Sequence, residues 1–154
     1  MLSMADAIER LDRLAATPAL AELARRFGDA GHELSLVGGP VRDSFLDRPV
    51  TDLDLTTDAR PDRILELVVP IADAHWDVGR EFGTIGARLG DHTVEITTYR
   101  SDEYRADSRK PAVAFGDTLD GDLARRDFTI NAMALRLPDR SHPRPRLADP
   151  VGGL

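Results

Sequence analysis

The sequence predicts an α/β (α+β) fold, with a small mixed β-sheet flanked by helices. Segments with the 3.6-residue periodicity of amphipathic helices alternate with short segments whose apolar residues recur at every second position. The chain has 154 residues, and its hydrophobic content of 42% is ordinary for a globular protein. We therefore expect residues 1–154 to form one domain around one core.

Composition excludes several classes of protein. Cysteine is absent, so the chain has neither a disulfide framework nor a thiolate metal site. The N-terminal stretch "MLSMADAIERLDRL" is too charged for a signal peptide, and no apolar run could span a bilayer. We therefore expect a cytoplasmic protein with no membrane partner. The formal net charge of −7 means that any contact with nucleic acid uses a local patch or another domain.

The first clear helix is "TPALAELARRFGDAG", residues 17–31. Thr17 is suited to cap it, Pro18 to its first turn and Gly31 to its exit. Its apolar stripe consists of Leu20, Leu23, Ala24 and Phe27.

Three further segments have helical character. Residues 58–74 form an amphipathic helix that we expect to be capped near Asp58. Residues 40–48 predict a short helix, and another is predicted to begin after Thr118.

The strands are predicted from period-two alternation and turn residues. Residues 32–39 form a strand that ends in glycine, and residues 51–57 alternate strictly. Residues 83–100 predict a hairpin that turns at Gly90 and Asp91, and "MALRL" is strand-like. We expect an irregular loop over 101–117, and a Pro- and Gly-rich tail over 138–154 that is typical of an interdomain boundary.

Carboxylates recur on the predicted strands. Asp52 and Asp54 are two residues apart, so they project from the same face, roughly 6–7 Å apart at the backbone. Glu95 alternates with apolar residues in the second strand of the hairpin, and it joins the pair if the two strands are neighbours. Three such oxygen ligands suit Mg²⁺. The alternative is that they are only the solvated face of amphipathic strands.

A glycine pair lies shortly before these carboxylates. In "VGGPVRD", Gly38 and Gly39 lead into a predicted helix, where backbone N–H groups can approach an anion and Arg42 can contact phosphate oxygens. The alternatives are an ordinary strand-to-helix turn, with Asp43 as a cap or as an ion-pair partner of Arg42.

A second polar motif is "LARRDFTINAMAL". Arg125 and Arg126 can neutralise a triphosphate, and Asp127 can orient an arginine or accept from a sugar hydroxyl. The alternative is a solvated helix end, with Asn131 as a cap.

Other residues carry weaker signals. The four histidines lack ligand spacing, and we expect Trp76 to pack in the core or between subdomains. A basic stretch is either solvated or an RNA contact; it comprises Arg100, Arg105, Arg109 and Lys110.

Taken together, the motifs resemble a known family. "LVGGPVRDSFLDRPVTDLDLTTDARP", "EFGTIGA", "VEITTYR", "YRADSRKPAVAFGDTL" and "DLARRDFTINAMAL" are similar to the N-terminal head of bacterial CCA-adding tRNA nucleotidyltransferases. That head is shared with bacterial poly(A) polymerases, within the DNA polymerase beta superfamily. "REFGTIGA" is closer to the CCA-adding pattern than to the arginine-rich equivalent in the polymerases.

The resemblance implies roles for these residues. Asp52, Asp54 and Glu95 would be catalytic and would bind two Mg²⁺ ions. The nucleotide-binding residues would be Gly38, Gly39, Arg42, Asp43, Arg125, Arg126, Asp127 and Asn131. RNA contacts would come from Arg100, Arg109 and Lys110. The segment from about Thr97 to Phe115 would be a flexible loop that takes part in the switch from C to A addition.

The reaction implied is addition of CMP and AMP, from CTP and ATP, to the 3′ end of tRNA with release of pyrophosphate. From the resemblance, we expect the C-terminal neck, body and tail domains of the family, including the neck motif that reads the incoming base, to be absent from this chain. The alternatives are a poly(A) polymerase, a small stand-alone nucleotidyltransferase, and a non-catalytic nucleotide-binding module.

Overall fold

A computed structural model describes residues 4–37, 52–90, 92–101, 114–115, 119, 122, 134–139 and 145–148. The helices and strands below lie within these ranges. Among them, no helix is long and apolar enough to cross a membrane.

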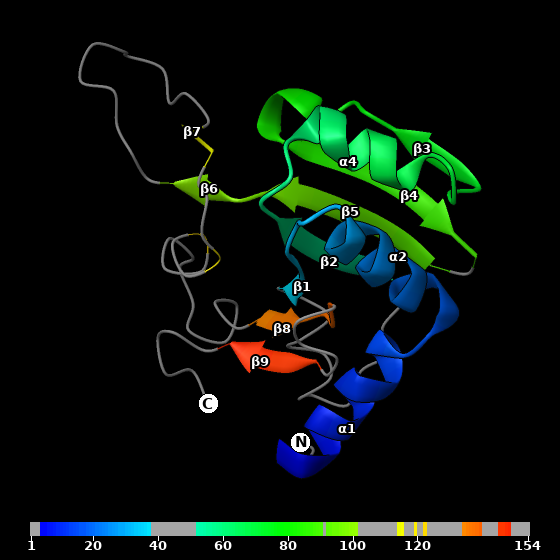
Figure 1. Ribbon diagram of the computed structural model, residues 1–154, viewed down its shortest axis with the longest axis vertical. Helices are drawn as coiled ribbons and strands as arrows, with labels where there is room; N and C mark the ends of the chain where they lie inside the picture. The colour runs from blue at the N-terminus through cyan, green and yellow to red at the C-terminus, as the bar shows by residue number, and fades with distance from the viewer. Residues whose placement is uncertain are drawn as a thin grey trace.

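A seven-stranded sheet in the order β3-β4-β5-β2-β1-β8-β9 forms the centre of the molecule (Figure 1). The only parallel neighbours in this sheet are β2 and β5, so the sheet is mixed, as predicted. A separate two-stranded ribbon pairs β6 with β7. The strands are β1 Leu34–Val37, β2 Asp52–Thr57, β3 Ala74–Trp76, β4 Thr84–Leu89, β5 His92–Thr98, β6 Arg100–Ser101, β7 Ala114–Phe115, β8 Ala134–Arg136 and β9 Arg146–Ala148.

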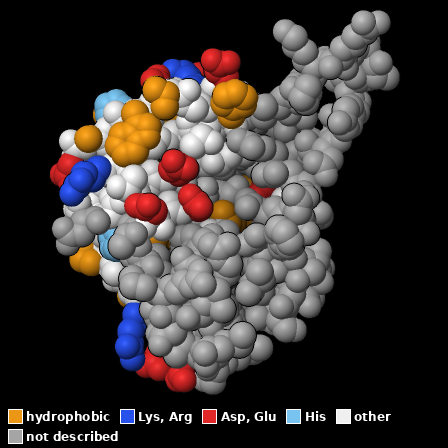
Figure 2. Space-filling model, turned by 180° about the vertical axis from the view of Figure 1, so that it is seen from behind, with side chains coloured by type: hydrophobic (Ala, Val, Ile, Leu, Met, Phe, Trp, Pro, Cys, Tyr) orange, Lys and Arg blue, Asp and Glu red, His pale blue; other side chains and the backbone are white. Residues whose placement is uncertain are grey.

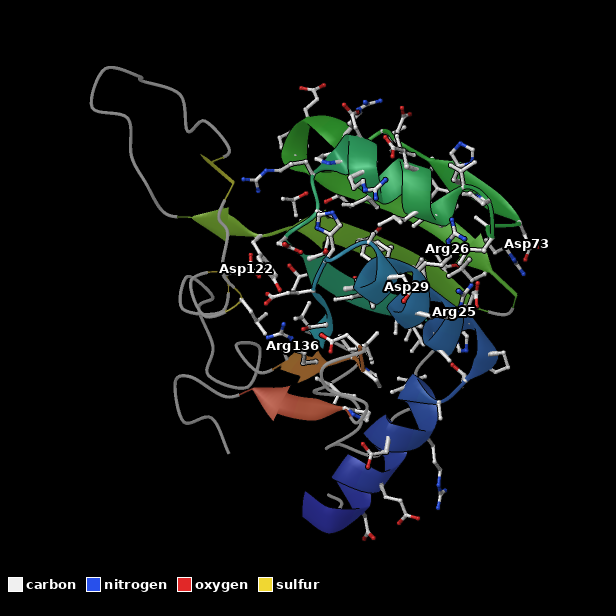
Figure 3. All side chains as sticks on the ribbon, viewed as in Figure 1. Arg25, Arg26, Asp29, Asp73, Asp122 and Arg136 are labelled. Carbon is white, nitrogen blue, oxygen red and sulfur yellow. The ribbon has the colours of Figure 1, made fainter. Side chains whose placement is uncertain are left out.

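The helices are α1 Met4–Ala15, α2 Pro18–Asp29 and α4 Pro61–Val68, with a short 3-10 helix η1 at Arg80–Phe82. Helices α2 and α4 lie side by side over one face of the sheet (Figure 1). The Nε of Arg26 on α2 donates to the carbonyl of Leu67 on α4 over 2.6 Å, which ties the two helices together (Figure 3).

The main core lies between these two helices and the sheet. Strands β1, β2, β4 and β5 contribute alternate residues to it, as a period of two along each strand requires. The buried members include Leu20, Leu23 and Phe27 from α2, Ile64, Leu67 and Val68 from α4, and Leu34, Leu36, Leu53, Leu55, Ile85, Ala87, Val94 and Ile96 from the strands.

The first predicted helix is confirmed in its limits, but one detail differs. Thr17 is the N-cap residue, Pro18 occupies the first turn, and Gly31 follows the helix with a φ of 81°. The hydroxyl of Thr17, however, donates to the carbonyl of Leu14 over 2.7 Å instead of capping α2. The hydroxyl therefore links the end of α1 to the start of α2.

The second predicted helix is shorter than expected, and Asp58 does not cap it. Helix α4 begins at Pro61, with Arg60 as its N-cap residue. Asp58 instead accepts the backbone N–H of Glu33 over 2.8 Å. Because Asp58 directly follows β2, its carboxylate reaches the neighbouring start of β1. Pro70 lacks the N–H that a further helical turn would need.

The β4–β5 hairpin is confirmed, with Gly90 at a φ of 60°. The "MALRL" strand is confirmed as β8. Within the Pro- and Gly-rich tail, Arg146–Ala148 pair with β8 as β9, a strand that the sequence did not predict. The expected loop boundary near Thr97 was also too early, because Thr97 and Thr98 belong to β5.

Ile96 tests the main core, because it is fully buried at the centre of the sheet. We expect Ile96→Ala to lower the free energy of unfolding by about 2–5 kcal/mol, since the substitution leaves a cavity. The measurement is urea unfolding followed by circular dichroism. The control is Val78→Ala, at a side chain that is 86% exposed, for which we expect a change within about 0.5 kcal/mol. Equal effects of the two substitutions would contradict this account of the core.

Candidate active site

The sheet face opposite α2 and α4 carries the predicted carboxylates. Asp52 and Asp54 are exposed on β2, while Leu53 and Leu55 between them are buried in the main core. The parallel register of β2 and β5 places Asp54 directly opposite Glu95, which is also exposed. The prediction that Glu95 joins the two aspartates on one surface is therefore confirmed. Figure 2 shows acidic side chains gathered near the centre of this face.

Asp54 and Glu95 belong to a row of residues that are paired directly across the sheet. From β3 to β8, the row is Trp76, Gly86, Glu95, Asp54, Val37 and Ala134. Neighbouring strands are about 4.8 Å apart, so Asp54 and Glu95 are separated at the backbone by about that distance. Val37 pairs with Asp54 and is the last residue before the glycine pair. The candidate phosphate-binding loop therefore begins beside the carboxylates.

The side chains are not arranged around a common point. Within the described ranges, no group of three His, Cys, Asp or Glu side chains is positioned to hold a metal ion. The register and the type of donor nevertheless suit a divalent cation that prefers oxygen ligands. Because all three side chains are exposed, changes of rotamer alone could bring their oxygens together without repacking the core.

Most other predicted site residues lie outside the described residues. They are Gly38, Gly39, Arg42, Asp43, Arg109, Lys110, Arg125, Arg126, Asp127 and Asn131. Arg100 lies in β6, where its backbone pairs with Phe115. Their proposed roles therefore stay predictions.

A buried polar contact lies next to the carboxylates. The hydroxyl of Thr56 on β2 donates to the carbonyl of Thr97 on β5 over 3.0 Å, and lies 3.5 Å from a carboxylate oxygen of Asp122. Asp122 is 1% exposed and lies on the same side of the sheet as Arg136 (Figure 3). Sequence analysis did not single out these residues. The period-two pattern alone could have placed Thr56 on the carboxylate face.

A second network joins β1, β5 and β8. The hydroxyl of Tyr99 donates to Glu33 over 2.9 Å, and a guanidinium nitrogen of Arg136 donates to the other oxygen of Glu33 over 2.6 Å. Tyr99 is fully buried in a small second core with Val37, Leu119 and Ala134. Burial, followed by the negative charge of Glu33 and the hydrogen bond to it, raises the pKa of Tyr99 well above its usual range.

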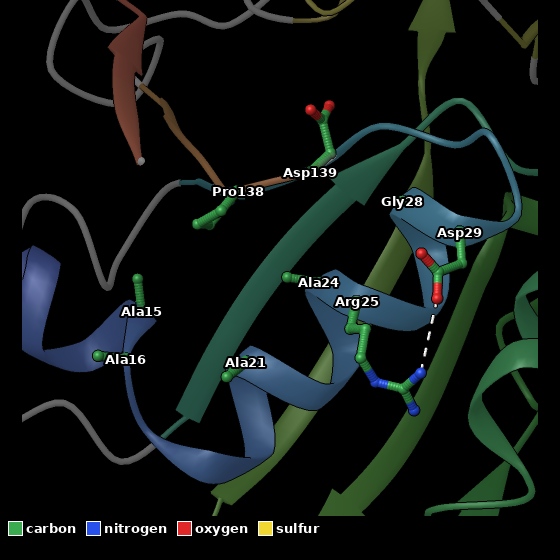
Figure 4. A pocket seen from close by; sticks show the side chains of 9 residues that line it. All are labelled: Ala15, Ala16, Ala21, Ala24, Arg25, Gly28, Asp29, Pro138 and Asp139. Carbon is green, nitrogen blue, oxygen red and sulfur yellow. Dashed lines mark ion pairs between the residues drawn. The ribbon is translucent and has the colours of Figure 1, made fainter. Parts of the chain in front are cut away.

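A cavity of about 340 Å³ lies away from the carboxylates, beside α1 and α2 (Figure 4). An ion pair of 3.5 Å between Arg25 and Asp29 borders it. Its lining is mostly small and apolar, formed by Ala15, Ala16, Ala21, Ala24, Arg25, Gly28, Asp29, Pro138 and Asp139. It has no convergent set of polar groups that would orient a substrate.

Known proteins share this fold. The chain belongs to the family described as the poly A polymerase head domain, whose model matches residues 34–154. The family defines the class of protein; the relatives are more specific. A CCA-adding enzyme from Bacillus subtilis is 45% identical over 108 residues, which is 70% of this chain and 26% of that protein. Another from Lactobacillus helveticus is 46% identical over 110 residues, 71% of this chain and 27% of that protein.

Solved structures agree with these sequence matches. The CCA-adding enzyme of Bacillus stearothermophilus in complex with CTP has a TM-score of 0.67 and 31% identity, and the match covers 89% of this chain and 31% of that one. An apo CCA-adding enzyme has a TM-score of 0.70 and 28% identity, with 97% of this chain and 33% of that one covered. The chain thus spans about a quarter of the length of its curated relatives, with 26% and 27% covered.

Tyr99→Phe tests the second network. We expect a loss of about 1 kcal/mol near pH 8, because the partly buried carboxylate of Glu33 loses a hydrogen-bond donor. A free tyrosine ionises near pH 10. Because the pKa of Tyr99 is raised in the folded state, its contribution to stability is complete below that pH and is lost as the pH rises above it.

The measurement is urea unfolding at pH 8, 9, 10 and 11. From pH 9 to 11 the wild-type chain should lose about 1.4 kcal/mol more than Tyr99→Phe, since one pKa unit corresponds to about that much. Parallel pH curves for the two proteins would show that Tyr99 is not protected from ionisation.

Proposed function

We propose that this chain is the catalytic head of a template-independent RNA nucleotidyltransferase. It adds CMP and AMP, from CTP and ATP, to the 3′ end of tRNA and releases pyrophosphate. The observation that carries the proposal is the pairing of Asp54 with Glu95 on one side and with Val37, just before the glycine pair, on the other. Two relatives named CCA-adding enzyme and a structural relative bound to CTP support it.

The carboxylates supply the binding site for divalent ions. Asp52, Asp54 and Glu95 would hold two Mg²⁺ ions, which activate the attacking RNA hydroxyl and steady the leaving pyrophosphate. The sheet holds the three carboxylates on one face, and catalysis then rests on position and charge without a covalent intermediate. The three residues fit this role because they supply carboxylate oxygens and because the pairing of β2 with β5 places them on one face.

The nucleotide would be held from two segments. Backbone N–H groups at Gly38 and Gly39, with Arg42 and Asp43, would bind the triphosphate. The segment that follows Asp122 would close on it. Its contacts would come from Arg125, Arg126, Asp127 and Asn131. Asp122 supports this arrangement, because its contact with Thr56 places Asp122 itself beside β2.

The RNA would approach from the same face. Arg100, Arg109 and Lys110 would contact its phosphates, and the protein would act in the cytoplasm. None of the proposed triphosphate contacts reads a base edge, so we expect this chain to bind triphosphates with little base preference. A poly(A) polymerase is the second candidate, because the family model carries that description. Extension of tRNA with CTP supports CCA addition, whereas extension with ATP alone supports poly(A) addition.

Calorimetry of triphosphate binding tests the site. We expect CTP, ATP, GTP and UTP to bind in the presence of Mg²⁺, and binding to be lost without Mg²⁺ or in the variant Asp52→Ala, Asp54→Ala. The control variant Glu22→Ala, Glu66→Ala removes the same charge from α2 and α4, and should bind like the wild type. Binding that survives without Mg²⁺ and in the double aspartate variant would contradict the proposed ion site.

Turnover tests whether the site is catalytic. Because the chain matches about a quarter of its relatives, the assay would join it to the C-terminal part of the Bacillus subtilis relative. We expect Asp54→Ala to reduce CMP incorporation into tRNA by at least about 100-fold with an unchanged fold, since a metal ligand contributes several kcal/mol. Undiminished incorporation by Asp54→Ala would support a site that binds nucleotides without using Asp54 in catalysis.

A further inference from the structure

Trp76 does not lie in the core, which was one of the two positions expected from the sequence, the other being between subdomains. It is 37% exposed and lies on the short strand β3, in the row that contains Glu95 and Asp54. Residues paired across antiparallel strands project from the same face, so the indole lies on the carboxylate face.

Gly86 leaves the space that the indole of Trp76 occupies on the carboxylate face. It is paired with Trp76 on one side and with Glu95 on the other. A Cβ atom at position 86 would come within 2.0 Å of the indole Nε1. The indole therefore lies over the backbone of β4 at Gly86, and the side chain stays 37% exposed. Since strands are about 4.8 Å apart, it lies one strand from Glu95 and two strands from Asp54.

The surroundings of Trp76 combine apolar and basic groups. Val78 and Phe82, in the segment that leads back to β4, are 86% and 54% exposed. Figure 2 shows hydrophobic side chains beside the acidic ones on this face. Arg88, two residues from Gly86 on β4, lies on the same face and is exposed. The Nε of Arg88 donates to the carbonyl of Gly90 over 3.3 Å, so the observation that points to a ligand is the exposed ring, on which a nucleic-acid base can stack.

The order of the strands decides which nucleotide reaches the ring. The glycine pair follows β1, on one side of Asp54, whereas Glu95, Gly86 and Trp76 lie on the other side. In an in-line displacement, the attacking hydroxyl and the leaving pyrophosphate lie on opposite sides of the phosphorus. If the triphosphate lies on the β1 side, the attacking hydroxyl comes from the side of β5, β4 and β3.

We propose that Trp76 stacks on the base of the 3′-terminal nucleotide of the acceptor RNA, and so positions its hydroxyl at Asp54 and Glu95. This inference rests on the proposed function. Stacking on an indole tolerates any base, because every base has a π-face. That property suits an acceptor end whose terminal base changes after each addition. Trp76 is thus a substrate-binding residue that orients the attacking group.

The chain offers a direct probe, because Trp76 is its only tryptophan. The experiment titrates the chain, at fixed salt and with Mg²⁺, with a tRNA acceptor minihelix that carries a fluorescent label at its 5′ end. Anisotropy of the label reports binding, and indole fluorescence reports stacking. We expect the indole to be quenched as the RNA binds, and not to be quenched by CTP alone.

Variants and a modified RNA separate stacking from general contact. Trp76→Ala should weaken binding of the minihelix by about 5- to 100-fold, and Trp76→Phe should weaken it less. The control Val69→Ala removes an exposed apolar side chain at the end of α4, away from the row, and should bind like the wild type. A minihelix that lacks the terminal base should bind the wild type and Trp76→Ala equally.

Failure of this inference differs from failure of the proposed function. If CTP binds with Mg²⁺ and the minihelix binds without quenching the indole, Trp76 is not the stacking platform and the nucleotide site stands. If the minihelix does not bind at all, the inference is also overturned. Quenching by CTP alone would place the incoming nucleotide on Trp76 and would overturn the strand-order argument.

Discussion

The parallel pairing of β2 with β5 is the constraint on which the rest of the structure depends. It runs over six residue pairs, from Asp52 opposite Thr93 to Thr57 opposite Thr98. Parallel strands cannot be joined by a tight turn, so α4, β3 and β4 fill the crossover between them. A shift of one residue in this register would turn the carboxylates into the core and the core leucines into solvent. The burial of the main core therefore also fixes the acidic face.

The acidic face is not uniform, and its asymmetry gives the site a direction. Toward β1 and β8 it is closed by the second core around Tyr99 and by the buried Asp122. Toward β4 and β3 it is open, with Trp76 lying on Gly86. A substrate that spans the carboxylates would meet the end of β1, which precedes the glycine pair, on one side and an exposed ring on the other. The two proposals above assign the triphosphate and the acceptor RNA to these two ends.

Local sequence patterns were sufficient to predict much of the fold and of the acidic face. The alternation around Asp52 and Asp54 predicted both a strand and the face that it exposes, because side-chain direction in a strand has a period of two. Pro18 and Gly31 predicted the limits of α2, because each restricts or permits particular backbone angles. The predictions from sequence failed where the contact of a side chain depends on a residue that is distant in the sequence. Asp58 suits a helix cap, yet the nearby start of β1 offers it a backbone N–H at 2.8 Å.

The sequence by itself determined the types of the central elements, the two-faced character of the strands and the set of carboxylates. These follow from φ and ψ preferences and from the spacing of apolar residues along one segment. Only the tertiary structure decided that β2 pairs with β5, that the tail adds β9, and that Trp76 lies on Gly86 instead of in the core. Those outcomes depend on which strands become neighbours, and that is decided by burial of the whole core and not by any single segment.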